Sequence, residues 1–200
     1  RFLADPSNPL AMRRVGKWIV GTTEALRQFR GIGVEGFHVP FLVDVDLAFP
    51  IPKGDARLEA ARKRWRIPRG RYLIGSFQRD TEGADLRSPK LIKGPDILAE
   101  VVRTLHRRGH PVHVVLARPR RNWLRQRLAA DGVPFTFVGE EIAGDDHPAN
   151  ILPQDELNLL YNVVDLYVVS SRSEGGPNTT QEAVACRCKT ISTRVGMAED

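Results

Sequence analysis

The sequence predicts an α/β fold with a doubly wound, Rossmann-like parallel sheet. Short and continuous apolar runs, such as residues 112–116, are typical of strands that are buried on both faces. Longer segments, such as residues 95–108, place apolar residues at the 3.6-residue spacing of an amphipathic helix. From Arg71 onward the two patterns alternate, beginning and ending with a strand. This alternation is characteristic of a parallel sheet that helices cover on both faces.

Residues 1–52 are predicted to form an interdomain or hinge segment with a short strand and a helix. Residues 18–20 are an apolar strand, and Thr22 and Thr23 are candidate N-caps for the helix that follows. Residues 39–47 predict a further strand that runs into an irregular crossing segment. A surface loop is an alternative interpretation of this stretch, with about equal weight.

Residues 53–200 are predicted to form the Rossmann-like domain. Asp55 can cap its first helix, which extends to Trp65. The predicted strands are residues 71–77, 112–116, 135–138, 166–169 and 190–193. The predicted helices between these strands are residues 95–108, residues 120–130, residues 157–164 and a helix that begins at Pro177.

Two connections at the carboxyl ends of predicted strands are unusually long. They are residues 78–93 and residues 139–153, whereas strand-to-helix connections usually have about 2–6 residues. Ligands of open parallel sheets bind at this edge. The first connection is basic, and its cations are Arg79, Arg87, Lys90 and Lys93. Grouped cations at a helix start can hold a diphosphate, although an exposed side chain is the alternative interpretation of each one.

The stretch 166–186 predicts an anion-binding site. An apolar strand leads into a glycine-rich turn, and Pro177 is placed at the first helical position, where proline is favoured. Gly176 would then be the N-cap, which leaves the N–H groups of Asn178 and Thr179 without helical partners. A strand, a glycine turn and a bare helix N-terminus together bind anions readily.

Two carboxylates accompany this predicted anion site. Glu174 precedes the turn, and Glu182 lies in the second turn of the helix. Carboxylates repel phosphate, but they accept hydrogen bonds from the hydroxyl groups of sugars. The combination therefore predicts a site for a sugar that is carried on a phosphate, as in a sugar-nucleotide donor.

The net charge of +6, from 30 basic and 24 acidic residues, favours anionic partners such as nucleotides, nucleic acids or acidic lipids. A solvated basic surface explains the charge equally well. The arginine-rich helix 120–130 lacks the interleaved aromatic residues of a nucleic-acid stacking surface, so its arginines are predicted to form a solvated face. Cys186 and Cys188 are too few for a disulfide framework, which is typical of a reducing compartment such as the cytoplasm.

Several function classes lack their sequence motifs. No G-x-G-x-x-G follows the first strand of the domain, and no G-x-x-x-x-G-K-[ST] occurs, which argues against a usual NAD-dependent enzyme and a P-loop NTPase. No apolar run approaches the roughly 18–20 residues that span a membrane. Asp44 and Asp46 have an Asp-x-Asp spacing but lie in the predicted hinge, so no metal requirement is predicted.

One segment has a family-specific pattern. Residues 171–178 (Ser-Arg-Ser-Glu-Gly-Gly-Pro-Asn) and Glu182 have a Glu-x7-Glu spacing, and Gly75-Ser76-Phe77 with Lys93-Gly94 is similar to a Gly-Arg-Leu…Lys-Gly segment. On these residues the chain resembles the donor-binding, C-terminal half of retaining glycosyltransferases of the family-four type, which have the two-domain GT-B fold. The resemblance covers nearly all of residues 17–200.

The resemblance implies roles for the candidate site residues. Glu174 would hold hydroxyls of the transferred sugar, and Glu182 would hold the ribose hydroxyls of a UDP- or GDP-linked donor. Lys93, together with Arg79, would neutralise the leaving diphosphate. The other donor-binding candidates are Gly75, Ser76, Gly175, Gly176, Asn178 and Thr179. Ser76 stands where the family has a phosphate-binding arginine, so that role would either pass to Arg79 or be weakened.

The resemblance also implies a reaction. The protein would transfer a sugar from a nucleotide-sugar to a sugar, lipid or polysaccharide acceptor with retention of configuration, in the cytoplasm or at the inner membrane face. It would need no cofactor and no nucleic acid. The amino-terminal acceptor domain and the carboxyl-terminal closing segment are expected to be missing, so the chain alone is expected to be poorly active or inactive. The alternatives are a nucleotide-sugar epimerase or sugar phosphorylase of the same fold, and a non-catalytic basic module that binds nucleic acid or membrane.

Overall fold

The computed structural model describes residues 11–176 and 178–199 of the chain. Its central feature is a five-stranded sheet in the order β7-β6-β3-β8-β9, in which every neighbouring pair runs parallel. The strands are β3 (Tyr72–Ser76), β6 (Val112–Ala117), β7 (Phe135–Val138), β8 (Leu166–Val169) and β9 (Thr190–Ser192). A short 3-10 helix, η3 (Gly196–Glu199), follows β9.

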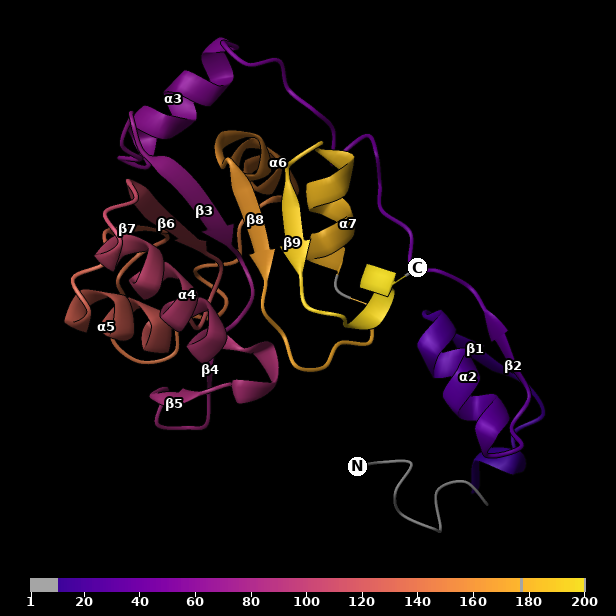
Figure 1. Ribbon diagram of the computed structural model, residues 1–200. Helices are drawn as coiled ribbons and strands as arrows, with labels where there is room; N and C mark the ends of the chain where they lie inside the picture. The colour runs from indigo at the N-terminus through magenta and orange to yellow at the C-terminus, as the bar shows by residue number, and fades with distance from the viewer. Residues whose placement is uncertain (1–10, 177, 200) are drawn as a thin grey trace.

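Helices cover both faces of this sheet (Figure 1). They are α3 (Ala56–Arg64), α4 (Pro95–Arg107), α5 (Asn122–Ala130), α6 (Gln154–Val163) and α7 (Asn178–Ala185). Successive strand residues point to opposite faces, so Leu73 packs with α3, α6 and α7, whereas Ile74 packs with α4 and α5. The doubly wound α/β prediction is confirmed. Of the helices in the described ranges, none combines the length and the apolar character needed to cross a membrane.

The order of the strands defines one special position at the carboxyl edge of the sheet. The chain forms β3 in the centre, adds β6 and β7 on one side, and then returns to the other side of β3 for β8 and β9. The strand order therefore reverses between β3 and β8. Open α/β sheets bind their ligands in the crevice outside the carboxyl ends of the strands at such a reversal.

The residues before the sheet form a small unit of β1 (Trp18–Val20), α2 (Thr23–Gly31) and β2 (Gly36–His38). The two strands pair in parallel. Thr22 caps the helix, because its side chain accepts a hydrogen bond from the backbone N–H of Ala25 at 3.1 Å. The predicted first strand, the helix and one of its two candidate caps are thus confirmed.

The strand that was predicted at residues 39–47 is wrong. The second strand of the small unit ends at His38, and the chain after it is irregular. Pro40 has no N–H to donate to a strand ladder. Further on, the Asp44 carboxylate accepts a hydrogen bond from the backbone N–H of Asp46 at 2.9 Å, which turns the backbone away from an extended course.

The long connection after β3 is folded against α5. It contains the two-residue strands β4 (Thr81–Glu82) and β5 (Ser88–Pro89) and the 3-10 helix η2 (Leu91–Lys93). The Asp80 carboxylate accepts from the backbone N–H of Leu124 at 3.3 Å, and Thr81 Oγ1 accepts from that of Trp123 at 2.9 Å. These N–H groups lie in the first turn of α5 and have no helical partner, so the connection caps this helix.

The predicted solvated face of the helix 120–130 is wrong for Arg121. Its side chain is 1% exposed and forms an ion pair with Asp80, with 3.1 Å between Nε and Oδ2. Arg121 also donates to Ser76 Oγ at 3.2 Å. The helix begins only at Asn122, because Arg120 has a positive φ that does not fit an α-helix. Burial raises the pKa of Asp80 and lowers that of Arg121 against their mutual attraction.

A buried histidine makes the stability of the sheet depend on pH. His113 of β6 is 8% exposed, its Nε2 lies 2.8 Å from Thr136 Oγ1, and burial together with the charge of Arg71 lowers its pKa to about 4. Between its ordinary value of 6.5 and this value, the unfolded chain binds a proton that the folded chain does not. The unfolding free energy should therefore fall by up to about 3 kcal/mol as the pH drops through this window.

Urea unfolding between pH 7 and pH 4 measures this dependence. The variant His113→Gln should lose this part of the pH dependence, whereas His110→Gln, which changes an exposed histidine, should keep it. A wild-type profile that coincides with that of His113→Gln would contradict the assignment.

Candidate functional site

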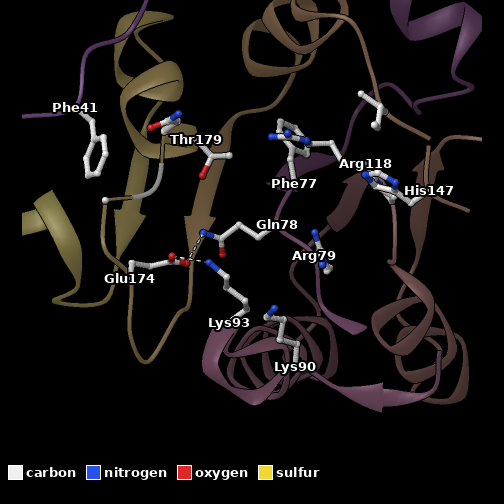
Figure 2. Close-up of a pocket in the computed structure, with 14 residues that line it drawn as sticks. Phe41, Phe77, Gln78, Arg79, Lys90, Lys93, Arg118, His147, Glu174 and Thr179 are labelled. Atoms are coloured by element: carbon white, nitrogen blue, oxygen red, sulfur yellow. Dashed lines mark hydrogen bonds and ion pairs between the residues drawn. The ribbon is translucent and has the colours of Figure 1, made fainter. Parts of the chain in front are cut away.

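A pocket of about 700 Å³ lies at the carboxyl edge of the sheet, where the strand order reverses (Figure 2). Its walls come from the connections after β3, β6, β7 and β8, from the start of α7, and from the crossing segment, which contributes Phe41. The described cations of the wall are Arg79, Lys90, Lys93 and Arg118. The excess of positive charge around one cavity favours an anionic ligand.

Lys93 is held in place by the close approach of two connections. It ends η2, and Gly94 follows as the N-cap of α4 with φ +61°. A Cβ on Gly94 would lie 1.8 Å from the backbone oxygen of Ser170, just beyond β8. Ser170 Oγ donates to the Gly94 carbonyl at 2.8 Å. Glycine is therefore required here by both its conformation and the space, and the contact aligns Lys93 with the connection after β8.

Glu174 lies beside Lys93 in the pocket wall and has three partners. Its Oε2 lies 2.5 Å from Lys93 Nζ, and its Oε1 accepts from Ser171 Oγ at 2.6 Å and from Gln78 Nε2 at 3.3 Å. Figure 2 shows the contacts with Lys93 and Gln78 as dashed lines between neighbouring side chains. The carboxylate side chain is only 6% exposed, so these donors offset the free energy that is needed to bury its charge.

The start of α7 contributes Asn178 and the buried Thr179 to the pocket wall. The proposed helix-opening residue, Pro177, lies outside the described residues. Gly176 has φ +141°, and a Cβ on it would lie 2.3 Å from ring atoms of Phe41. The aromatic ring of the crossing segment is thus seated directly against the glycine turn.

Glu182 is tied to the core of the domain. Its Oε2 accepts a hydrogen bond from the hydroxyl of Tyr161 at 2.8 Å, and Tyr161 packs against Phe77 and Tyr167 with ring centroids 5.1 and 5.3 Å away. Burial, with Tyr167 and Glu182 nearby, raises the pKa of Tyr161 well above its ordinary value, so the hydroxyl remains a donor. A carboxylate has about four acceptor positions, so Glu182 keeps capacity for a ligand.

The structure brings some of the predicted site residues together and leaves others out. The pocket wall includes Glu174, Lys93, Arg79, Gly176, Asn178 and Thr179. The described part of the wall does not include Gly75, Ser76, Gly175 or Glu182. Gly75 and Ser76 are buried in β3, and the Ser76 hydroxyl accepts from Arg121 rather than facing the cavity.

Sequence reasoning missed two charged or titratable residues of the wall, Arg118 and His147. Arg118 follows β6 and so lies at the same edge of the sheet as the other cations, which is the signal that could have found it. His147 lies on the connection after β7, which Asp146 fixes by accepting from the backbone N–H of Arg120 at 2.8 Å and from the amide of Asn150 at 2.7 Å. These buried contacts hold the loop against the connection after β6.

The chain matches a known protein family over more than half of its length. The family model for glycosyl transferases group 1 matches residues 86–200. This match includes Lys93, Arg118, Glu174 and Glu182. No curated protein matches the chain.

Solved structures share the fold. A glycosyltransferase from Rickettsia africae superposes with a TM-score of 0.73 at 15% identity over 96% of this chain and 49% of its own. HepE of Anabaena, solved with UDP and glucose, has a TM-score of 0.71 at 15% identity. The match covers 100% of this chain and 52% of HepE. Sucrose-phosphate synthase from Thermosynechococcus elongatus has a TM-score of 0.67 at 16% identity. The match covers 94% of this chain and 43% of the synthase. The chain therefore spans about half the length of these proteins.

Proposed function

The chain belongs to the glycosyl transferases of group 1, and we propose that its pocket binds the nucleotide-sugar donor of a sugar-transfer reaction. The observation that carries this proposal is the combination of a cationic pocket and one buried carboxylate, Glu174, at the point where the strand order reverses. Cations suit a diphosphate, and a carboxylate suits sugar hydroxyls. A nucleotide-sugar has both groups side by side, and it is the donor that we propose for this family.

In this proposal each wall of the pocket takes one part of the donor. Lys93, Arg79 and Arg118 stabilise the negative charge that develops on the departing diphosphate, which is the main electrostatic task in such a transfer. Glu174 accepts from hydroxyls of the transferred sugar, beside the backbone of the Gly176 turn. Glu182, which lies outside the described wall of the pocket and is bonded to Tyr161, accepts from the ribose. Transfer with retention of configuration, to a sugar, lipid or polysaccharide acceptor, completes the proposed reaction.

Calorimetry on the purified chain tests donor binding. We expect UDP- or GDP-sugars to bind with millimolar or better affinity, and the UDP and glucose in the HepE structure make UDP-glucose the first donor to test. A folded sample that binds none of these donors at millimolar concentration would refute the proposal. Competition by inorganic phosphate alone would instead favour a sugar phosphorylase.

Replacing Glu182 by glutamine should weaken the binding of free nucleoside diphosphate and of nucleotide-sugar to the same extent, because the ribose is common to both. A hydrogen bond to a charged acceptor contributes about 1.5–3 kcal/mol, so the loss should be roughly ten- to a hundredfold. Glutamine keeps an acceptor for the Tyr161 hydroxyl, so the core should stay intact. The two affinities are measured by calorimetry. Glu141→Gln, which changes a carboxylate that is 82% exposed, is the control and should leave both unchanged. A loss confined to the nucleotide-sugar would argue against ribose binding.

A further inference from the structure

The ion pair between Lys93 and Glu174 joins the two groups that the donor would need to separate. Lys93 Nζ lies 2.5 Å from Glu174 Oε2, and the side chains are 27% and 6% exposed. In the proposed function Lys93 serves the diphosphate and Glu174 serves the sugar. Without a ligand, each of these charges neutralises the other at the pocket wall (Figure 2).

Backbone contacts hold both partners in this arrangement. The N–H of Arg172 donates to the carbonyl of Ile92 at 2.8 Å, and the Arg172 guanidinium donates to the carbonyl of Leu91 at 2.8 Å and to Asp96. The connection after β8 is therefore attached to η2 next to Lys93. Because the two side chains start from fixed positions, their ion pair loses less side-chain entropy than an exposed pair does.

The pair places different demands on two possible ligands. A free nucleoside diphosphate that draws Lys93 away from Glu174 leaves a nearly buried carboxylate with Ser171 and Gln78 as its remaining described donors. Removing one partner of a buried ion pair is strongly unfavourable. A nucleotide-sugar makes the same exchange but supplies sugar hydroxyls, which donate to Glu174 in place of the ammonium group.

We propose that the Lys93–Glu174 pair makes the pocket select nucleotide-sugars over free nucleoside diphosphates, an inference that rests on the proposed function. Once the sugar has moved to the acceptor, Glu174 loses its hydroxyl donors and competes again with the diphosphate for Lys93. The same pair thereby promotes release of the nucleoside diphosphate product. Arg79, Lys90 and Arg118 also face the pocket, so the free diphosphate is disfavoured rather than excluded.

Calorimetric titrations of the full chain with UDP, GDP, UDP-glucose and GDP-mannose test this selection. In Glu174→Gln the free diphosphate should bind about tenfold more tightly than in the wild type, because Lys93 is released from its partner. The affinity for the nucleotide-sugar should not increase. Glu174→Asp keeps the charge but withdraws it from Lys93, so it should also bind the free diphosphate more tightly. Glu141→Gln removes a charge elsewhere and should change neither affinity.

A second background separates exchange of Lys93 from simple repulsion between Glu174 and phosphate. In Lys93→Met the pair is absent, so adding Glu174→Gln should change the affinity for the free diphosphate by less than about twofold. A tenfold gain that persists in this background would overturn the inference, as would the absence of any gain in both Glu174 variants when the wild type binds ligand. A wild type that binds neither diphosphate nor nucleotide-sugar would instead refute the proposed function itself.

Discussion

Replacing Gly94 by alanine is expected to lower the free energy of unfolding by about 2–5 kcal/mol and to abolish measurable donor binding. Two effects add at this position. An L-residue with φ near +61° has a left-handed conformation that costs about 1–2 kcal/mol. The new Cβ would also lie 1.8 Å from the Ser170 carbonyl oxygen, and relieving such an overlap costs about another 1–3 kcal/mol. The relief must separate Lys93 from the connection that carries Glu174.

Gly132 provides a matched control for Gly94→Ala. It has φ +68°, and no heavy atom lies within 4 Å of a Cβ placed on it. Gly132→Ala should therefore show only the conformational strain, about 1–2 kcal/mol, and should bind donor as the wild type does. Urea unfolding and calorimetry measure the two effects. Equal losses of stability in the two variants would show that the contact with Ser170 has no energetic effect.

Replacing Arg121 by methionine is expected to destabilise the domain by about 3–5 kcal/mol, because it leaves the Asp80 carboxylate buried without its counter-charge. The side chains of Arg121 and Asp80 are 1% and 2% exposed, so water cannot solvate the remaining charge. The same change should also disturb donor binding, since Asp80 adjoins Arg79 of the pocket wall. Urea unfolding gives the free energy, and calorimetry gives the affinity.

A double variant distinguishes the charge effect from a loss of packing. Asp80→Leu with Arg121→Met removes both charges, so most of the stability should return. A deficit of about 1 kcal/mol should remain, because Asp80 also caps the first turn of α5. Arg172→Met, which breaks an ion pair whose side chains are 46% and 37% exposed, should cost no more than about 1 kcal/mol. A double variant as unstable as Arg121→Met would contradict the buried-charge explanation.

Much of the fold follows from local patterns. The apolar runs and amphipathic segments predict the alternation of strands and helices from residue 71 onward, and the short side chains of Thr22 and Asp55 predict two helix starts that the structure confirms. The failures have local causes as well. At residues 39–47 apolar content suggested a strand, but Pro40 and the turn at Asp44 interrupt the backbone. In α5 the positive φ of Arg120 delays the start of the helix.

The candidate site could be predicted in part. The Glu-x7-Glu segment and the basic connection after β3 identify Glu174, Lys93 and Arg79, and these residues do line one pocket. Arg118 and His147 reach the same pocket from two other connections, which no short motif links to the first two. Arg79 is exposed, whereas Arg121 is buried. The composition of their segments does not predict this difference.

The amino-acid sequence alone predicts the order of the elements, and with it the edge of the sheet at which the connections gather. Hydrophobic periodicity and capping are local, so they can be followed along the chain without knowledge of distant neighbours. Which charges face the pocket and which neutralise one another can be known only from the tertiary structure. Lys93 and Glu174 are 81 residues apart in the chain, yet they form one ion pair. Burial and pairing depend on what the fold places beside each side chain, and that is a property of the assembled sheet.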